Sequence, residues 1–313
     1  MRTHVTIRMT KLRGNWASLL LPINDDDSID FARLGEEIDI LIATGVDGIY
    51  SNGTAGEFHS QTEAEFDRIQ HLLAERCTTA GMDFIIGACQ PDARQSLDRV
   101  RRAASLKPRA IQVILPDWWP VSNAEARTFL EDACAAAPGI PLVLYNPPHA
   151  KRVLSPTDLA ETLTGLPQVV GVKLAGGNAD WYADARTHLD DLALFVPGHH
   201  LASGHKEGVA AGAFSNVACL SPTGAQRWTE LMHTDLPAAL EIETRLRQFI
   251  LGHILPFAEQ GYSNAALDKL LAAIGGWAPV GTRLRRPYTS IDPAGALQLR
   301  PIAKSLIPEI MLD

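Results

Sequence analysis

Three side chains with complementary chemistry stand where short apolar, β-rich runs of the sequence end. Thr54, Tyr145 and Lys173 each lie at or just after the last residue of such a run. In a barrel of parallel strands the active site forms at the C-terminal ends of the strands, so we expect these side chains to share one opening. A hydroxyl, a phenol and an amine placed together can attack a carbonyl group and move the protons that the attack requires.

Lys173 is the candidate nucleophile. It lies in the segment VVGVKLAGG, with apolar residues before it and small residues after it. Apolar surroundings disfavour the charged amine and move its pKa toward neutrality, and a neutral amine attacks ketones to form an imine. The sequence alone also allows a lysine whose ammonium group simply extends into solvent at the barrel opening. Likewise, Tyr145 fits either a proton relay or ordinary packing with a satisfied hydroxyl.

The glycine-rich segment Ser51–Glu57 joins a strand to a helix. Its consecutive backbone N–H groups, near Gly53, Thr54 and Ala55, can hold a carboxylate. The alternative is a plain βα turn that needs glycine for its geometry.

The pattern of the chain predicts the scaffold for these residues. Eight β-rich runs alternate with amphipathic helical segments, and most of the runs are apolar throughout, as in a parallel sheet covered on both faces. We therefore predict an α/β fold, a (β/α)₈ TIM barrel. The predicted strands are Ala17–Leu21, Gly48–Ser51, Asp83–Gly87, Ala110–Leu115, Pro141–Tyr145, Val169–Lys173, Leu192–Val196 and Ala213–Ala218. Capping signals at Thr62–Glu65, Ser122–Glu125 and Ser155-Pro156 predict helix starts.

After the eighth run only helical patterns continue, over Glu230–Phe257, Ala265–Ile274 and Ala294–Leu306. We predict a catalytic barrel over residues 1–222 and an additional C-terminal helical extension over residues 223–313 that packs on it.

Composition narrows the function. The chain of 313 residues carries 36 acidic and 28 basic residues and a net charge of −8, which disfavours nucleic acid and anionic membranes as partners. The four cysteines form no CxxC pair, and no apolar run reaches the ~18 residues that span a bilayer. We therefore expect a cytoplasmic protein. No metal-binding motif is present, although a metal-dependent hydrolase stays open if His199, His200 or His205 converges with carboxylates.

Several segments together resemble the dihydrodipicolinate synthase/N-acetylneuraminate lyase family. GVDGIYSNGTAGEF resembles the GTTGE segment of that family, LVLYNPP its YN-x-P segment, and VVGVKLAGG the strand that carries the Schiff-base lysine. LLLPINDDDSIDFARL is similar to the opening strand and helix of the family. The motifs occur in the family's order and spacing over about the first 220 residues.

The resemblance implies roles for individual residues. Lys173 would form the imine, Tyr145 would relay protons, and Thr54 would supply a relay hydroxyl. The backbone N–H groups of Thr54 and Ala55 would bind the carboxylate of pyruvate or a related 2-oxo acid. The family further implies a homotetramer and neither a metal nor an organic cofactor, and we expect a tetramer or dimer here.

The chain departs from the synthase at the positions that meet the second substrate. Ala55 replaces the second threonine of the GTTGE motif, and Asp117 and Trp118 replace a pair of tyrosines. The synthase arginine that follows Tyr145 is missing, and Arg152 is the candidate replacement. We include Trp118, Arg152 and Phe214 with Gly53 and Ala55 as candidate substrate-binding residues.

The sequence thus predicts a Schiff-base-forming lyase or aldolase that acts on pyruvate or a related 2-oxo acid. The alternative is a dehydratase of 2-oxo-3-deoxy sugar acids that uses the same lysine. A true 4-hydroxy-tetrahydrodipicolinate synthase and a non-catalytic 2-oxo-acid-binding barrel are less favoured.

Overall fold

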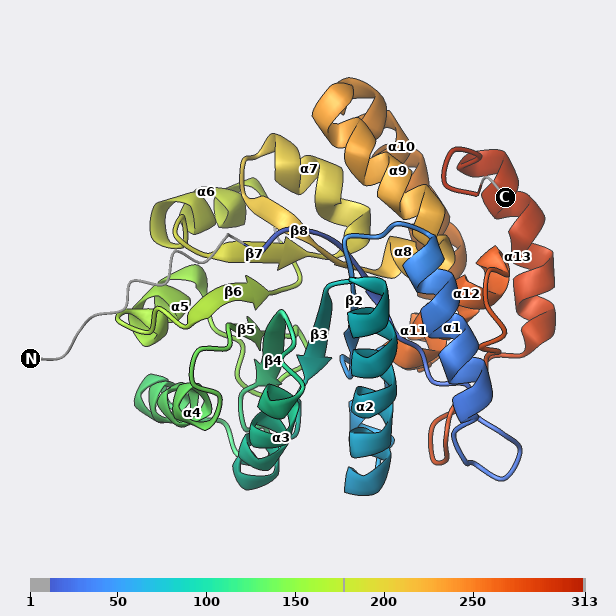
Figure 1. Cartoon of the computed structure of the whole chain (residues 1–313). Helices are drawn as coiled ribbons and strands as arrows, with labels where there is room; N and C mark the ends of the chain where they lie inside the picture. Colours follow the sequence, from blue (N-terminus) through green and yellow to red (C-terminus); the bar gives the residue numbers. More distant parts are fainter. Residues whose placement is uncertain (1–11, 177, 312–313) are drawn as a thin grey trace, which may run out of the picture.

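The computed structural model describes residues 12–176 and 178–311, and its strands close into a barrel (Figure 1). All eight strands are parallel; each pairs with the next in sequence, and β8 pairs with β1. This confirms the predicted TIM barrel. The strands are β1 (Gly14–Ser18), β2 (Gly48–Ser51), β3 (Phe84–Gly87), β4 (Ala110–Ile114), β5 (Leu142–Tyr145), β6 (Val169–Lys173), β7 (Ala193–Val196) and β8 (Ala210–Ser215).

The first and last strands differ from their predicted ranges. β1 begins and ends three residues earlier than Ala17–Leu21, and the rest of that apolar run continues as a buried loop. β8 ends at Ser215, whose hydroxyl accepts a hydrogen bond from the backbone N–H of Ala218 and so caps a short helix. Runs that are apolar throughout do not distinguish a strand from a neighbouring buried segment, which explains both errors.

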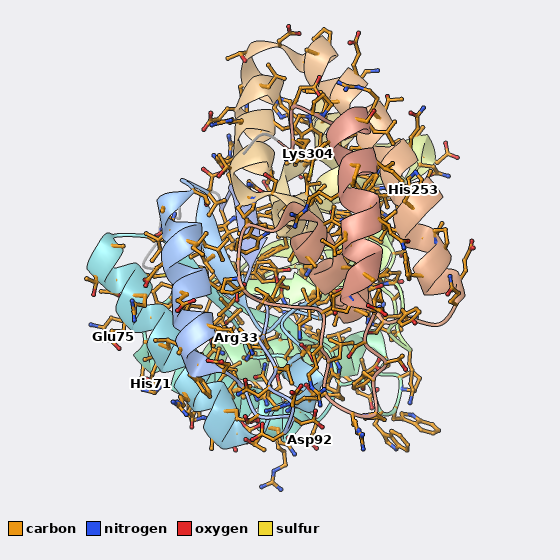
Figure 2. The ribbon with its side chains drawn as sticks, turned by 90° about the vertical axis from the view of Figure 1, so that its right-hand side faces the viewer. Arg33, His71, Glu75, Asp92, His253 and Lys304 are labelled. Carbon is orange, nitrogen blue, oxygen red and sulfur yellow. The ribbon has the colours of Figure 1, made fainter. Side chains whose placement is uncertain are left out.

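Helices surround the barrel on its outer side (Figure 1). Those between strands are α1 (Phe31–Ala43), α2 (Glu63–Ala80), α3 (Ala93–Ser105), α4 (Asn123–Ala136), α5 (Pro156–Leu163), α6 (Ala179–His188) and α7 (Leu201–Lys206); α8 (Asn216–Leu220) follows β8. The capping boxes at Thr62–Glu65 and Ser122–Glu125 are both formed, and Ser155 caps α5 with Pro156 in its first turn. Polar residues such as His71 and Glu75 project from the outer face of α2 (Figure 2). Among the described residues no helix is both long and apolar enough to cross a membrane.

The C-terminal segment forms more helices than predicted. The single pattern Glu230–Phe257 divides because Asp235 caps a new helix with proline in its first turn. The helices are α9 (Pro222–Thr234), α10 (Leu236–Phe249), the π-helix η3 (Ile250–Ile254), α11 (Leu255–Glu259), α12 (Asn264–Gly275) and α13 (Pro293–Leu306). α12 packs against α8 and α13 lies outside it (Figure 1). The division of the chain at residue 222 stays a prediction.

A buried ion pair fixes the orientation of α12 about its own axis. The Lys269 amine lies 2.6 Å from a carboxylate oxygen of Glu57, and it also donates to the backbone carbonyl of Arg283. Both side chains of the pair are almost fully buried. Because a buried charge without its partner is costly, Lys269 must face Glu57, and the opposite face of α12 is turned toward the strand ends.

Candidate functional site

The Lys173 amine lies among aromatic rings at the C-terminal end of the barrel. Its Nζ is 4.2 Å from the ring centroid of Tyr145, 5.0 Å from that of Tyr50 and 5.3 Å from that of Phe214. Burial lowers the pKa of Lys173 to about 8, and the nearby carboxylate of Asp268 limits the shift. A substantial fraction of the amine is therefore neutral near pH 8, as a nucleophile requires.

Tyr145 ends β5 directly beside Lys173, because the register of the two strands pairs these residues. Its hydroxyl lies 3.3 Å from Oγ1 of Thr54. Burial raises the pKa of Tyr145 to about 12, so the phenol stays protonated at neutral pH and can donate a proton. The structure thus brings together Lys173, Tyr145 and Thr54 from three separate strand ends, as the sequence predicted.

The loop after β2 passes close to the amine. A Cβ on Gly53 would lie 3.5 Å from Nζ of Lys173 and 2.8 Å from the Tyr50 ring, so a side chain at this position would collide with the ring. In the described part of the chain, the backbone N–H groups of Thr54 and Ala55 donate no hydrogen bond. Two free donors beside an amine can hold the carboxylate of a 2-oxo acid.

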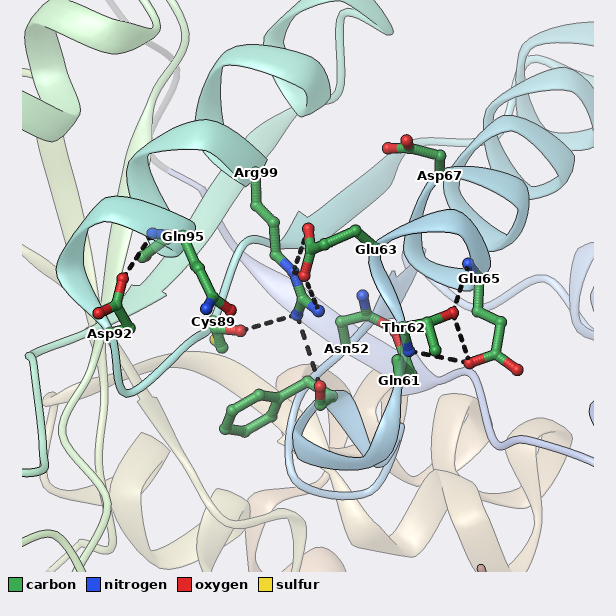
Figure 3. A network of polar contacts seen from close by, with 12 residues as sticks. Asn52, Gln61, Thr62, Glu63, Glu65, Asp67, Cys89, Asp92, Gln95 and Arg99 are labelled. Atoms are coloured by element: carbon green, nitrogen blue, oxygen red, sulfur yellow. Dashed lines mark hydrogen bonds and ion pairs between the residues drawn. The ribbon is translucent and has the colours of Figure 1, made fainter. Parts of the chain in front are cut away.

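A polar network holds this loop in place (Figure 3). The Gln61 amide donates to Oδ1 of Asn52 at 3.0 Å and to the Gly56 carbonyl at 2.8 Å. Behind the loop, buried Arg99 forms an ion pair with Glu63 at 2.8 Å and donates to the carbonyl of Cys89, which packs with Tyr145. Arg99 and Cys89 therefore connect the loop and Tyr145 to the same buried cluster of side chains.

Two cavities meet at Tyr145. The larger, about 330 Å³, extends from Lys173 toward the C-terminal helices. Its lining residues are Tyr145, Pro148, Lys173, Leu174, Ala175, Val196, Pro197, His199, Phe214, Asn216, Ile250, Leu251, Ile254, Leu255, Asn264, Leu267, Asp268 and Leu271. The smaller cavity, about 90 Å³, includes Thr54, Asp117, His149 and Arg152.

Two predicted substrate-binding residues, Trp118 and Arg152, do not lie beside the Lys173 amine. Trp118 is 84% exposed and lines neither cavity, and its carbonyl accepts a hydrogen bond from Lys151. Arg152 borders only the smaller cavity, where it donates to Asn123 at 2.7 Å and lies 3.4 Å from Asp158. Gly53 and Phe214 do lie beside Lys173, and Ala55 is buried in the loop. The binding roles of all five stay predictions.

Sequence reasoning missed the acidic residue of the site. Asp268 lines the larger cavity with Lys173, and burial raises its pKa to about 7, although the Lys173 charge opposes this shift. The sequence does contain one sign of this residue, an aspartate inside the apolar helical pattern Ala265–Ile274. A single acidic residue in such a pattern is also found on any partly solvated helix face, so it did not indicate a site.

His199, His200 and His205 do not converge with carboxylates on a metal site in the described structure. His199 and His200 have ring centroids 4.4 Å apart, and His205 packs on His233 instead. Burial lowers the pKa of His199 to about 4, so its ring is neutral at pH 7. No group of three or more His, Cys, Asp or Glu residues that could hold a metal ion occurs in the part of the chain that the structure describes.

Comparisons with known proteins bear on the fold and the family of the chain. Solved structures of similar fold include YagE, a prophage protein of Escherichia coli K12 in complex with pyruvate, with TM-score 0.82 and 20% identity over 95% of this chain and 99% of that one. Another is N-acetylneuraminate lyase from Fusobacterium nucleatum, with TM-score 0.81 and 19% identity over 95% of this chain and all of that one. At these identities the likeness establishes the fold.

Two relatives show closer similarity in sequence. The chain is 30% identical over 187 residues to 4-hydroxy-tetrahydrodipicolinate synthase of Methanothermobacter thermautotrophicus, and 30% identical over 191 residues to N-acetylneuraminate lyase of Shigella boydii. Each alignment covers 59% of this chain, and 64% and 62% of the two relatives, respectively, so less than two thirds of either relative is matched. The model of the dihydrodipicolinate synthetase family, in contrast, matches residues 11–306. The chain therefore belongs to the dihydrodipicolinate synthetase family.

Proposed function

We propose that this chain is a class I lyase in which Lys173 forms an imine with pyruvate or a related 2-oxo acid. The observation that carries the proposal is the position of the Lys173 amine beside the protonated phenol of Tyr145. Burial lowers the pKa of this amine to about 8. The amine and the phenol are the two groups that imine formation requires, a nucleophile and a proton donor.

The proposed steps use the residues in order. The backbone N–H groups of Thr54 and Ala55 bind the substrate carboxylate, and the neutral Lys173 amine attacks C2 of the ketone. A proton moves from the attacking nitrogen to the former ketone oxygen and gives the carbinolamine. Tyr145 then donates its proton to the carbinolamine hydroxyl, which leaves as water. Thr54 takes up a proton from solvent as it gives its own to Tyr145 through their contact of 3.3 Å, so both hydroxyls are restored. The protonated imine then accepts the electron pair released when a bond at C3 breaks.

The larger cavity is the proposed space for the remainder of the substrate. It adjoins Lys173 and contains no arginine among the described residues. Because a carboxylate on the second reactant would find no guanidinium there, the cavity supports a lyase more than a synthase that uses an acidic aldehyde.

Deuterium exchange into pyruvate tests the proposal without a second reactant. In D₂O the enzyme is expected to remove the methyl signal of pyruvate from the proton NMR spectrum, because the imine exchanges with its enamine. A methyl signal that decays no faster than without enzyme would contradict the function. Release of pyruvate from 4-hydroxy-2-oxo acids then separates a lyase from the alternative dehydratase, which would release water and no pyruvate.

The rate of this exchange is expected to rise with pH through about pH 8 and to level off above it. Below that pH the Lys173 amine is protonated and cannot attack the ketone, since its pKa lies near 8 instead of 10.5. Measurement of kcat/KM for exchange between pH 6 and 10 checks the prediction. A rise centred near the ordinary lysine pKa would show that burial does not activate the amine.

We also propose that the chain forms a homo-oligomer in the cytoplasm. The adjacent side chains of Trp118 and Trp119 are 84% and 79% exposed, and large exposed aromatic residues are typical of subunit contacts. The free thiols of all four cysteines suit a reducing compartment. Sedimentation velocity is expected to give a dimer or tetramer that the double variant Trp118→Ser, Trp119→Ser weakens; a monomeric wild-type protein would contradict the proposal.

A further inference from the structure

Asp268 has a position in the site that none of the steps above uses. On α12 the residues Asn264, Leu267, Asp268 and Leu271 follow the helical spacing i, i+3, i+4, i+7, and all four line the cavity of Lys173. The next residue, Lys269, points the other way into its buried ion pair with Glu57. The carboxylate of Asp268 is therefore held on the cavity side.

This carboxylate has no protein partner. Within the described residues it makes no hydrogen bond and no ion pair; the residue is partly buried, and desolvation raises the pKa of its carboxyl to about 7. The titratable groups that influence it or respond to it come from four elements: Lys173 on β6, Tyr145 on β5, Tyr50 on β2 and Cys219 on α8. A carboxylate kept without a partner beside a nucleophile is typical of a group that exchanges a proton with a ligand.

The loop approaches the amine but does not line the larger cavity. The backbone at Gly53 approaches Nζ of Lys173, but no residue of the loop from 51 to 57 lines the larger cavity. For a 2-oxo acid whose carboxylate lies on the loop and whose C2 is bonded to Lys173, we infer that C3 and C4 extend into this cavity, because Lys173 lines it. Asp268 lines that cavity, whereas Thr54 does not. Tyr145 also lines it, but burial raises the pKa of its phenol to about 12, so the phenol is protonated at neutral pH and is a poor proton acceptor.

The rest of the cavity is mainly apolar and carries little positive charge. Its outer wall is formed by Ile250, Leu251, Ile254, Leu255, Leu267 and Leu271. Three of these residues come from the π-helix η3, and π-helical segments occur frequently at functional sites. Lys173 is the only lysine or arginine that lines the cavity in the described chain, and His199 is neutral at pH 7. An anionic group here would meet a carboxylate and no compensating cation.

We propose that Asp268 is the catalytic base for carbon–carbon cleavage of a 4-hydroxy-2-oxo acid whose C4 carries an uncharged, apolar substituent. This inference rests on the proposed function. The ionised Asp268 takes the proton from the C4 hydroxyl, the C4–O bond becomes a carbonyl, and the C3–C4 bond breaks. Its electron pair forms the C2–C3 double bond and neutralises the iminium nitrogen.

An apolar aldehyde then leaves, and the enamine of pyruvate stays on Lys173. Asp268 returns its proton to C3, which restores the iminium ion. Water hydrolyses this ion, and pyruvate and the free amine are released. No oxidant, metal or further reactant is needed, and Asp268 is ionised again at the end.

The test compares Asp268→Asn with the wild-type protein on three probes. Pyruvate alone reports the imine, by borohydride trapping. 4-Hydroxy-2-oxo-4-phenylbutanoate carries an apolar substituent at C4, and 4-hydroxy-2-oxoglutarate carries a carboxylate there. We expect Asp268→Asn to trap pyruvate as the wild type does but to cleave the phenyl compound about 10²–10⁴-fold more slowly, the usual contribution of a general base.

Two further readouts distinguish catalysis from support of the fold. Wild-type protein is expected to cleave the phenyl compound several-fold faster than the glutarate, and Asp268→Asn to reduce that preference. The pH at which borohydride trapping of pyruvate rises is expected to fall in the variant, because the Asp268 charge no longer favours the protonated Lys173 amine. The exposed control Asp184→Asn on α6 should change none of these results.

The outcomes separate the two proposals. Wild-type protein that traps no pyruvate overturns the proposed function itself. A variant that traps pyruvate and cleaves the phenyl compound as fast as wild type overturns the role of Asp268 alone. Wild-type protein that traps pyruvate but prefers the glutarate overturns the apolar substrate class.

Discussion

Lys173→Met is expected to lower turnover of a 2-oxo acid substrate by more than about 10³-fold, because no other group replaces a covalent nucleophile. Methionine retains the unbranched shape of the side chain and removes an amine whose charged form is disfavoured by burial. The thermal midpoint of the variant should therefore equal or exceed that of the wild type, because the substitution removes a desolvated ionisable group.

Steady-state assays and thermal unfolding of the same preparations check this prediction. Lys206→Met, at an exposed position at the end of α7, is the matched control and should retain full activity. A Lys173→Met protein that folds normally and keeps more than about a tenth of wild-type turnover would exclude an obligatory imine, given the usual cost of losing a nucleophile.

Tyr145→Phe is expected to reduce kcat about 10²–10⁴-fold, since it removes the proton donor and leaves the ring beside Lys173 in place. Imine formation should slow without disappearing. The variant loses one hydrogen bond of 3.3 Å to Thr54, so its free energy of unfolding should fall by only about 1 kcal/mol.

A double-mutant cycle with Thr54→Val examines the relay. If Thr54 acts through Tyr145, the loss in the double variant should be smaller than the product of the two single losses. Tyr288→Phe, at a half-exposed tyrosine that packs on His59, provides the control. Independent, multiplicative effects of Thr54 and Tyr145 would contradict a shared proton path.

The fold could be predicted from the sequence because the helix and strand patterns agree with the order of elements in a barrel. Eight apolar runs alternate with capped helices, and hydrogen bonds such as the one from the Glu65 backbone to Thr62 satisfy the predicted helix starts. The boundaries of β1 and β8 were wrong for a physical reason. Both adjoin buried apolar residues, and hydrophobicity does not report where a ladder of strand hydrogen bonds ends.

The sequence predicted only those site residues that lie at the ends of strands. Parallel strands present their C-terminal ends at one opening, which is sufficient to bring together Thr54, Tyr145 and Lys173. Asp268 reaches the same opening from a helix almost a hundred residues later in the sequence. Its orientation depends on the ion pair between Lys269 and Glu57, a tertiary contact that no local pattern reports.

The proposed chemistry depends on a covalent bond between the amine of Lys173 and a 2-oxo acid. Reduction with sodium borohydride in the presence of pyruvate, followed by mass spectrometry of the proteolytic peptides, detects this bond. We expect a stable secondary amine on Lys173 that forms only when pyruvate is present. An unmodified Lys173, under conditions that modify the lysine of a control class I aldolase, would exclude the imine.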